Sequence, residues 1–504
     1  MMTDAPPGTT APILSARGIT KRFGGVTALD GVSLDLIPGE VHCLAGENGC
    51  GKSTLIKIIS GAERPDAGEI SIDGDTRSRM DTTSAITSGI QVIYQDFSLF
   101  PNLTVAENIV LTSAVAAKHR LYRAGTARPR AKAIVDELQL DLDLDADVAD
   151  LSVADKQLTA ICRALVNDAR VIIMDEPTTA LTHTEVARLF TIVERLRSRG
   201  VALAFVSHKL EEVLEISQRV TIMRSGRVVT SGPVADFDRR SIAEHMTGRE
   251  LDESRIVSTL DESAPPMLEV VGLSRPGAFH DVSFSVRPGE ILGITGLLGS
   301  GRTEIAEAVF GSQPAASGII AVDGAPTAVR SIRDAVRAGI GYVPEDRLSQ
   351  GLFLEKPIAD NIIAGSLDAH RTPWRSLDKR RIRATIDRLF AELSIKAPNP
   401  QAPVRSLSGG NAQRVVIAKW LATDPKVLIL NGPTVGVDVG SKSQILELLR
   451  REAARGMAVV VISDDAPELV ACCHRVLVVA RGRIAHELRG DEITAENLQN
   501  RMAV

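Results

Sequence analysis

The chain reads Gly46-Glu47-Asn48-Gly49-Cys50-Gly51-Lys52-Ser53-Thr54 at the point that decides its fold. This stretch follows an apolar run that we predict to be a strand, Val41–Ala45, and leads into a predicted helix, Thr54–Ile59. A glycine-rich turn between a strand and a helix surrounds phosphate oxygens with backbone N–H groups, and the helix N-terminus favours their charge. Lys52 adds a positive charge beside the β- and γ-phosphates, and the Ser53 hydroxyl can bind Mg²⁺. All nine residues are therefore candidates for a nucleotide phosphate site.

Two carboxylates follow another predicted strand further along the chain. Val171–Met174 is an apolar run that ends in Asp175 and Glu176. A carboxylate at a strand end can hold Mg²⁺, and a second one beside it can polarise an attacking water. Alone, the pair could equally be a solvated strand terminus. With the phosphate loop upstream we assign Asp175 to the metal and Glu176 to catalysis.

The pattern of the first half recurs in the second half. Early landmarks correspond at a separation of 250 residues, as in the pairs Pro38 and Pro288, Lys52 and Arg302, and Gln95 and Glu345. Later landmarks correspond at a separation of 256 residues, as in the pairs Ser152 and Ser408, Asp175 and Asn431, and His208 and Asp464. A nearly constant separation with one insertion indicates a duplicated domain.

The duplication suggests the domain organisation and the fold class. We expect a flexible tail over 1–14, a first domain over 15–250, a linker over 251–267 and a second domain over 268–504. Apolar runs such as Ala202–Val206 alternate with amphipathic helical stretches, which is typical of a parallel α/β core. Mostly helical stretches near 96–165 and 346–420 predict a helical subdomain in each half. The sequence thus predicts two tandem P-loop domains.

Bulk composition excludes some function classes. The chain has 504 residues, which fits two domains, and 44% of them are hydrophobic. A net charge of −5 gives no electrostatic reason to expect nucleic acid as a partner. The chain start has no pattern of a signal peptide, and no apolar run approaches the ~20 residues of a membrane span. We therefore expect any membrane role to come through a partner.

Several further segments resemble those of ABC-type ATPases, and the resemblance covers roughly 15–500. Leu151-Ser152-Val153-Ala154-Asp155 resembles the family's signature segment. Gln95 resembles its Q-loop glutamine, which implies a catalytic and metal-binding role, and His208 resembles its switch histidine. Phe23 lies where the family has an aromatic residue that stacks on adenine, although core packing is an alternative for this ring. The resemblance implies ATP and Mg²⁺ as ligands, in a dimer that holds each ATP between the phosphate loop of one domain and the signature of the other.

The second half has lost most of the residues that act on ATP. Its loop keeps Gly296, Gly299, Gly301 and Thr303, but Arg302 replaces the lysine, so phosphate binding can survive. The other replacements are Asn431 for Asp175, Gly432 for Glu176, Asp464 for His208 and Glu345 for Gln95. An amide is a poor substitute for a metal-binding carboxylate, and glycine cannot orient water. We therefore predict that this site holds nucleotide and hydrolyses it slowly or not at all.

The signature segments differ in the opposite sense. Leu407-Ser408-Gly409-Gly410-Asn411 keeps both glycines, whose N–H groups can approach a phosphate closely, whereas the first signature has lost them. In the arrangement that the resemblance implies, the complete first loop meets Ser408, Gly409 and Gly410. We therefore expect one hydrolytic composite site and one that acts as a hinge.

Within the family, the chain resembles the ATP-binding protein of ribose-type sugar importers. The arginine phosphate loop, the segment Tyr342–Arg347 and the segment Gly436–Gly440 carry this resemblance. It implies two integral-membrane permease subunits, indirectly a periplasmic solute-binding protein, and a peripheral position on the cytoplasmic face of the inner membrane. Asn431-Gly432 departs from the family, which usually keeps an acidic residue there.

Two functions other than sugar import are alternatives for this chain. A nucleoside or signalling-molecule importer would use a similar ATPase. A tandem ABC translation factor acting on the ribosome would usually have a long, highly charged linker and two intact sites, unlike this chain. Two basic clusters, Lys118–Lys132 and Arg371–Arg383, are either solvated helical faces or surfaces that face a permease and anionic lipid.

Overall fold

A computed structural model describes residues 11–77, 80–116, 124–179, 181, 183–207, 209–248, 260–261, 263–372, 374 and 376–502. The chain divides into two compact units, Met1–Leu251 and Asp252–Val504. The first described strand begins at Leu14, and the first strand of the second unit begins at Leu268. Most of the predicted linker, 251–267, lies outside the described residues, so its bounds stay a prediction.

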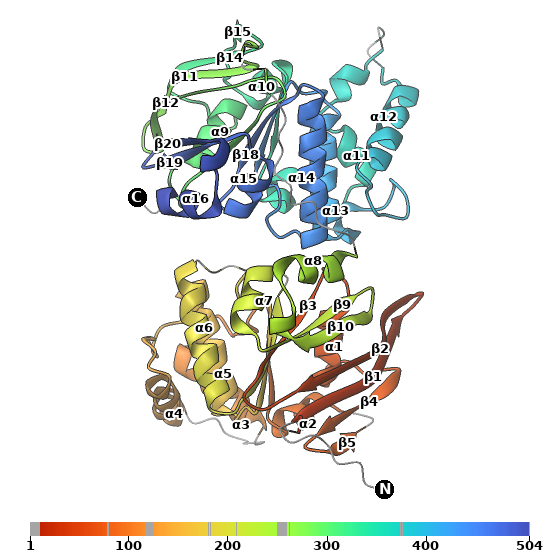
Figure 1. Cartoon of the computed structure of the whole chain (residues 1–504), viewed down its shortest axis with the longest axis vertical. Coiled ribbons are helices and arrows are strands. Elements are labelled where there is room, and N and C mark those ends of the chain that lie inside the picture. The colour runs from red at the N-terminus through yellow and green to blue at the C-terminus, as the bar shows by residue number, and fades with distance from the viewer. Residues whose placement is uncertain are drawn as a thin grey trace. The chain divides into compact units, whose positions relative to one another are not determined.

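The first unit contains a six-stranded sheet and a four-stranded antiparallel sheet (Figure 1). The larger sheet has the order β10-β9-β3-β8-β7-β6 and is parallel except for its edge strand β10. The smaller sheet has the order β2-β1-β4-β5. The strands are β1 (Leu14–Phe23), β2 (Val26–Leu36), β3 (Val41–Gly46), β4 (Ala67–Ile72), β5 (Asp75–Arg77), β6 (Ile90–Ile93), β7 (Val171–Asp175), β8 (Ala202–Ser207), β9 (Arg219–Arg224) and β10 (Arg227–Pro233).

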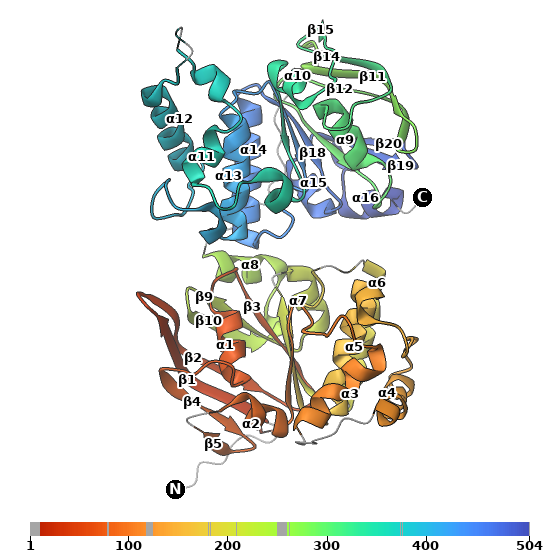
Figure 2. The same cartoon turned by 180° about the vertical axis from the view of Figure 1, so that it is seen from behind.

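Helices connect these strands and form the predicted helical subdomain. Three of them, α3, α4 and α5, lie within or next to the predicted stretch 96–165 and away from the antiparallel sheet (Figures 1 and 2). The helices of the unit are α1 (Lys52–Ile59), α2 (Thr82–Thr87), α3 (Val105–Ala116), α4 (Ala124–Glu137), α5 (Val153–Val166), α6 (His183–Ser198), α7 (Leu210–Ile216) and α8 (Arg239–Thr247). Among the described residues of either unit, no helix is long and apolar enough to span a membrane.

The second unit repeats this architecture, which confirms the fold predicted from the internal repeat. Its sheets have the orders β16-β17-β18-β13-β19-β20 and β12-β11-β14-β15. The strands are β11 (Leu268–Arg275), β12 (Phe279–Val286), β13 (Ile291–Thr295), β14 (Ser317–Val322), β15 (Ala325–Pro326), β16 (Ile340–Val343), β17 (Val427–Asn431), β18 (Ala458–Ile462), β19 (Arg475–Ala480) and β20 (Arg483–Arg489). The helices are α9 (Arg302–Phe310), α10 (Ile332–Arg337), α11 (Ile358–Ile363), α12 (Lys379–Glu392), α13 (Gly409–Leu421), α14 (Val439–Ala454), α15 (Ala466–Cys472) and α16 (Ala495–Met502).

The parallel strands are buried along nearly their whole length, which explains their continuous apolar sequences. Every residue of β8 and β18 is buried, and β7 is buried up to Met174. Strands covered on both faces need apolar side chains at every position rather than at alternate positions. Because β3, β8 and β7 are parallel neighbours, their carboxyl ends meet at one edge of the sheet. The phosphate loop and Asp175 therefore follow strands that end at the same edge.

Candidate nucleotide sites

The phosphate loop of the first unit has a backbone shape that requires glycine. Gly46 and Gly51 have φ angles of 156° and 108°. A Cβ atom at Gly46 would lie 2.5 Å from the Met223 carbonyl oxygen, and one at Gly51 would lie 2.6 Å from the Ala28 carbonyl oxygen. No such neighbour lies within 4 Å at Gly49, which faces open space. The loop is therefore held tightly at its two ends and is open at its centre.

The start of helix α1 adds charge and free donors to this loop. Lys52 is only 5% exposed, and its Nζ donates to the carbonyl oxygens of Gly46 at 2.6 Å and Glu47 at 3.0 Å. Among the residues that the structure describes, no side chain caps the helix N-terminus, so its first N–H groups are available to an anion. Ser53 is exposed and Thr54 half-buried in the first turn. The shape and charge of this cradle suit a nucleotide phosphate chain, and the assignment of its residues stays a prediction.

Asp175 ends β7 next to the strands that carry the loop. Burial raises the pKa of its carboxyl group, the Glu176 charge raises it further, and Lys52 and Lys57 act in the opposite direction. A cation bound beside Asp175 would favour the charged form, because opposite charge stabilises a carboxylate. This half-buried carboxylate is therefore suited to a metal ion.

Glu176 follows in an unusual backbone conformation. Its φ angle is 48°, and its backbone N–H donates to the Val206 carbonyl oxygen at 3.0 Å. The Thr179 hydroxyl lies 3.4 Å from Glu176 Oε2 and can donate to it. A non-glycine residue held at positive φ is strained, and such strain is often found at functional positions.

Of the three remaining predicted residues of the first site, the structure describes Gln95 and Phe23. Gln95 is exposed just after β6. Phe23 is 48% exposed at the end of β1, with the Lys21 ammonium 5.2 Å from its ring centre. This exposure removes core packing as the explanation for Phe23. His208 lies outside the described residues.

The second unit keeps the shape of the phosphate loop. Gly296 and Gly301 have φ angles of 155° and 102°, close to those of Gly46 and Gly51, and Gly299 faces open space. The N-terminus of α9 likewise has no side-chain cap. Arg302 is 7% exposed, and its Nη2 lies 3.4 Å from Asp464 Oδ2. The loop backbone therefore still fits phosphate, whereas the positively charged side chain of Arg302 already has an acidic partner, Asp464.

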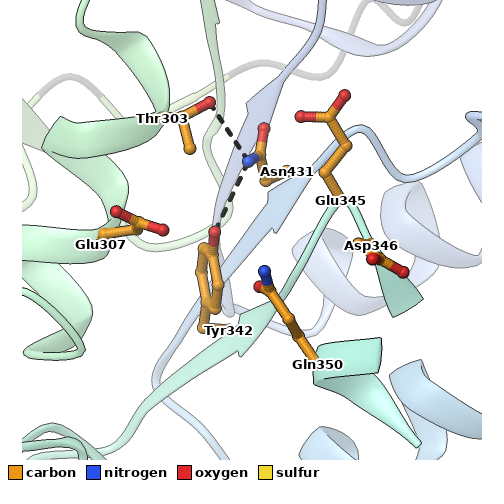
Figure 3. A pocket seen from close by; sticks show the side chains of 7 residues that line it. All are labelled: Thr303, Glu307, Tyr342, Glu345, Asp346, Gln350 and Asn431. Atoms are coloured by element: carbon orange, nitrogen blue, oxygen red, sulfur yellow. Dashed lines mark hydrogen bonds between the residues drawn. The ribbon is translucent and has the colours of Figure 1, made fainter. Parts of the chain in front are cut away.

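A pocket of about 350 Å³ adjoins this loop (Figure 3). Its lining consists of Thr303, Glu307, Tyr342, Glu345, Asp346, Gln350 and Asn431. The Asn431 amide nitrogen lies 3.3 Å from Thr303 Oγ1 and 3.5 Å from the Tyr342 hydroxyl, so it can donate to either (Figure 3). Burial raises the pKa of Tyr342 to about 12, so the ring stays neutral.

Sequence reasoning did not single out Glu307 or Gln350 of this pocket. Glu307 occupies the position of Lys57, 250 residues earlier, and the separation of the repeats could have revealed the exchange. Burial raises the pKa of Glu307, and Glu304 adds to this effect. The second unit therefore has an acidic side chain, Glu307, at the position where the first unit has the positively charged Lys57.

The two signature segments begin their helices differently. Ser152 caps α5: its hydroxyl accepts from Asp155 N–H at 3.1 Å and donates to Asp155 Oδ2 at 2.8 Å. Helix α13 has no such side-chain cap. A Cβ atom at Gly410 would lie 2.5 Å from Ser441 Oγ, and one at Gly409 would lie 2.9 Å from the Gly436 carbonyl oxygen. The two glycines therefore also permit close packing, a role that the sequence did not indicate.

These features define a class of protein, the P-loop nucleoside triphosphatases with a duplicated domain. Two stretches of the chain, 29–179 and 279–435, match the ABC transporter family. The ribose import ATP-binding protein RbsA 1 of Rubrobacter xylanophilus is 45% identical over 488 residues, which cover 97% of each chain. A putative ribose/galactose/methyl galactoside import ATP-binding protein 2 of Burkholderia cenocepacia is 43% identical over 499 residues, covering 99% of this chain and 98% of that protein. The chain belongs to the ABC transporter family and is an ABC-type ATPase.

One solved structure resembles the chain over both domains. The archaeal ribosome recycling factor aABCE1, crystallised with the stalk protein aP1, covers 96% of this chain and 92% of its own, with a TM-score of 0.62. The sequences are 20% identical, so the likeness concerns the fold alone. It carries no argument for an action on the ribosome.

Proposed function

We propose that this chain powers the import of a sugar, of the ribose or galactose type, through a membrane permease. The observation that carries the proposal is that the phosphate loop and Asp175 follow strands ending at one sheet edge of the first unit, in a chain 45% identical to a ribose import ATP-binding protein. The partners would be two permease subunits and, indirectly, a periplasmic solute-binding protein. The chain would then lie peripherally on the cytoplasmic face of the inner membrane.

The first unit supplies the groups that hydrolysis requires. The loop N–H groups and Lys52 would hold the phosphates of ATP, and Ser53, Gln95 and Asp175 would hold Mg²⁺. When bound, Mg²⁺ would neutralise charge on the β- and γ-phosphates. Glu176 would orient a water and accept its proton, and His208 is the proposed second catalytic side chain.

The second unit would hold nucleotide without turning it over. Gly432 has a φ angle of 59°, and its N–H donates to the Ile462 carbonyl oxygen at 2.8 Å, so its backbone matches that of Glu176. The scaffold of the site is retained, but Gly432 has no side chain to activate water. The uncapped N-terminus of α13, with Ser408, Gly409 and Gly410, would complete the competent site of the first unit.

Steady-state ATP hydrolysis by the chain with its permease tests the one-site proposal. We expect Glu176→Gln to reduce turnover to background while ATP still binds. The same type of substitution in the second unit, Glu345→Gln at the position of Gln95, should leave most of the turnover. If about half of the turnover survived in Glu176→Gln, the second site would hydrolyse ATP and the proposal would be wrong.

Transport by the reconstituted complex tests the cargo. Labelled ribose and galactose should enter vesicles in an ATP-dependent manner, and excess nucleoside should not compete. Uptake of nucleoside instead of sugar would favour the alternative importer. Co-purification with ribosomes rather than with integral permeases would contradict both importer proposals.

A further inference from the structure

The second phosphate loop differs from the first in how its buried cation is used. Arg302 Nη2 lies 3.4 Å from Asp464 Oδ2, so part of its charge is already balanced by a carboxylate. Its Nη1 is buried and has no hydrogen-bond partner among the described residues. A buried donor without a partner is costly and marks a place where a ligand can bind. One nitrogen of Arg302 is therefore left for an anion.

The surroundings of the loop oppose a third phosphate. Asp464 lies beside Arg302, and Glu345 and Asp346 line the adjoining pocket together with Glu307 (Figure 3). In the first unit the positions of Glu345 and Glu307 carry a neutral glutamine and a lysine, Gln95 and Lys57. Like charges close together in a low-dielectric site repel strongly. A γ-phosphate here would meet two carboxylates where the first unit offers a neutral and a positive group. Asp346 does not add to this difference, because the first unit has Asp96 at the same position.

A divalent cation usually offsets this repulsion, but the second loop is poorly suited to bind one. A divalent cation next to a phosphate loop needs the Ser/Thr hydroxyl and a carboxylate as ligands. Here the Asn431 amide nitrogen lies 3.3 Å from Thr303 Oγ1 and can donate to the lone pairs that a cation would use. Asn431 itself brings no charge. The glycine cradle and the uncapped start of α9, which serve the α- and β-phosphates, remain intact.

We propose that the second phosphate loop binds a nucleoside diphosphate in preference to a triphosphate and needs no divalent cation to do so. This inference rests on the proposed function in one respect, namely that the second loop holds nucleotide at all. The site would then be a resident ADP site and not a slow ATP site.

Nucleotide titration tests the preference. Fluorescent ADP and ATP would be titrated into the full-length Lys52→Ala variant, in which the first loop is weakened, with either Mg²⁺ or EDTA. We expect ADP to bind at least about tenfold more tightly than ATP, which is ~1.4 kcal/mol, and to be unaffected by EDTA. Adding Arg302→Ala should abolish this binding.

A gain-of-function variant and a second readout keep the inference falsifiable. Asn431→Asp, Glu345→Gln and Asp464→His together restore first-unit residues and should shift the preference toward ATP with Mg²⁺. In the wild-type chain, azido-ADP should label peptides of the second unit in EDTA. Equal or tighter binding of ATP would overturn the diphosphate preference alone. Absence of any nucleotide in the second unit would overturn the nucleotide-holding role as well.

Discussion

Single residues distinguish the two units on nearly identical backbones. Glu176 and Gly432 have φ angles of 48° and 59°, and each donates its N–H to the neighbouring strand. Holding a glutamate at such an angle costs ~1–2 kcal/mol, which glycine avoids. The first unit therefore tolerates strain where a side chain must reach water. The second unit has lost the side chain without any rebuilding of the loop.

A buried glutamate gives the second unit a pH dependence. Burial raises the pKa of Glu468 to about 7 from its ordinary value of 4.5, while Ser463 Oγ donates to Glu468 Oε2 at 2.6 Å. Because the folded state holds this proton more tightly than the unfolded chain does, the stability it contributes is complete below about pH 4.5 and declines as the pH rises to about 7. The decline should be about 3 kcal/mol at most.

Urea unfolding at several pH values checks this expectation. The difference in unfolding free energy between wild type and Glu468→Gln should change across the window from pH 4.5 to about 7, because the amide does not titrate. Above this window, the unfolding free energy of Glu468→Gln should compare better with that of the wild type than it does at low pH. A difference that stays constant with pH would show that Glu468 keeps an ordinary pKa.

At the scale of elements, one arginine joins three segments of the second unit. Arg347 begins a short π-helical turn, Arg347–Gly351, and its Nη1 and Nη2 donate to the carbonyl oxygens of Val435 at 2.5 Å and Gly436 at 3.2 Å. A Cβ atom at Gly409, the first residue of α13, would lie 3.0 Å from Nη2. The turn after β16, the loop after β17 and the start of α13 therefore meet at one guanidinium group.

Removal of this group should loosen all three segments. We expect Arg347→Ala to lower the unfolding free energy of the second unit by about 1–3 kcal/mol and to lower ATP turnover by the competent site. Arg347→Lys keeps the charge and N–H donors on a single nitrogen, so it should lose less stability and less turnover. Urea unfolding and steady-state hydrolysis measure the two effects. Turnover that is unchanged in a destabilised Arg347→Ala would limit the residue to a structural role.

The elements themselves were largely predictable, whereas the contacts between them were not. Strands such as β7 and β18 follow from apolar runs, because a strand buried on both faces leaves no freedom for polar residues. The Asn431–Thr303 contact joins residues 128 positions apart, and neither residue type specifies the other. The Arg302–Asp464 pair depends in the same way on how β13 and β18 align. Sequence therefore identified the candidate residues but not their pairing.

At the scale of the whole molecule, the basic helix α12 is a candidate surface for binding anionic lipid. Arg380 and Arg381 are exposed in its first turn, whose backbone N–H groups donate to Asp378. Most of the other basic cluster, Lys118–Lys132, lies outside the residues whose side chains the structure describes. Basic side chains near an anionic surface contribute about 1 kcal/mol each. Negative charge in a first helical turn is favourable, so reversal of these two charges should leave the helix folded.

Flotation of the full-length chain with vesicles that contain anionic lipid measures this contribution. Arg380→Glu combined with Arg381→Glu should weaken vesicle binding by about 30-fold or more, because two attractive contacts of ~1 kcal/mol are lost and repulsion is added. ATP binding should not change, because α12 packs against α11 and α13 and lies apart from α9, the helix that follows the second phosphate loop (Figures 1 and 2). Arg481→Glu with Arg483→Glu, exposed near the turn between β19 and β20, serves as a control of equal charge. If the α12 double variant binds vesicles like the wild type, α12 is a solvated face and makes no contribution to membrane binding.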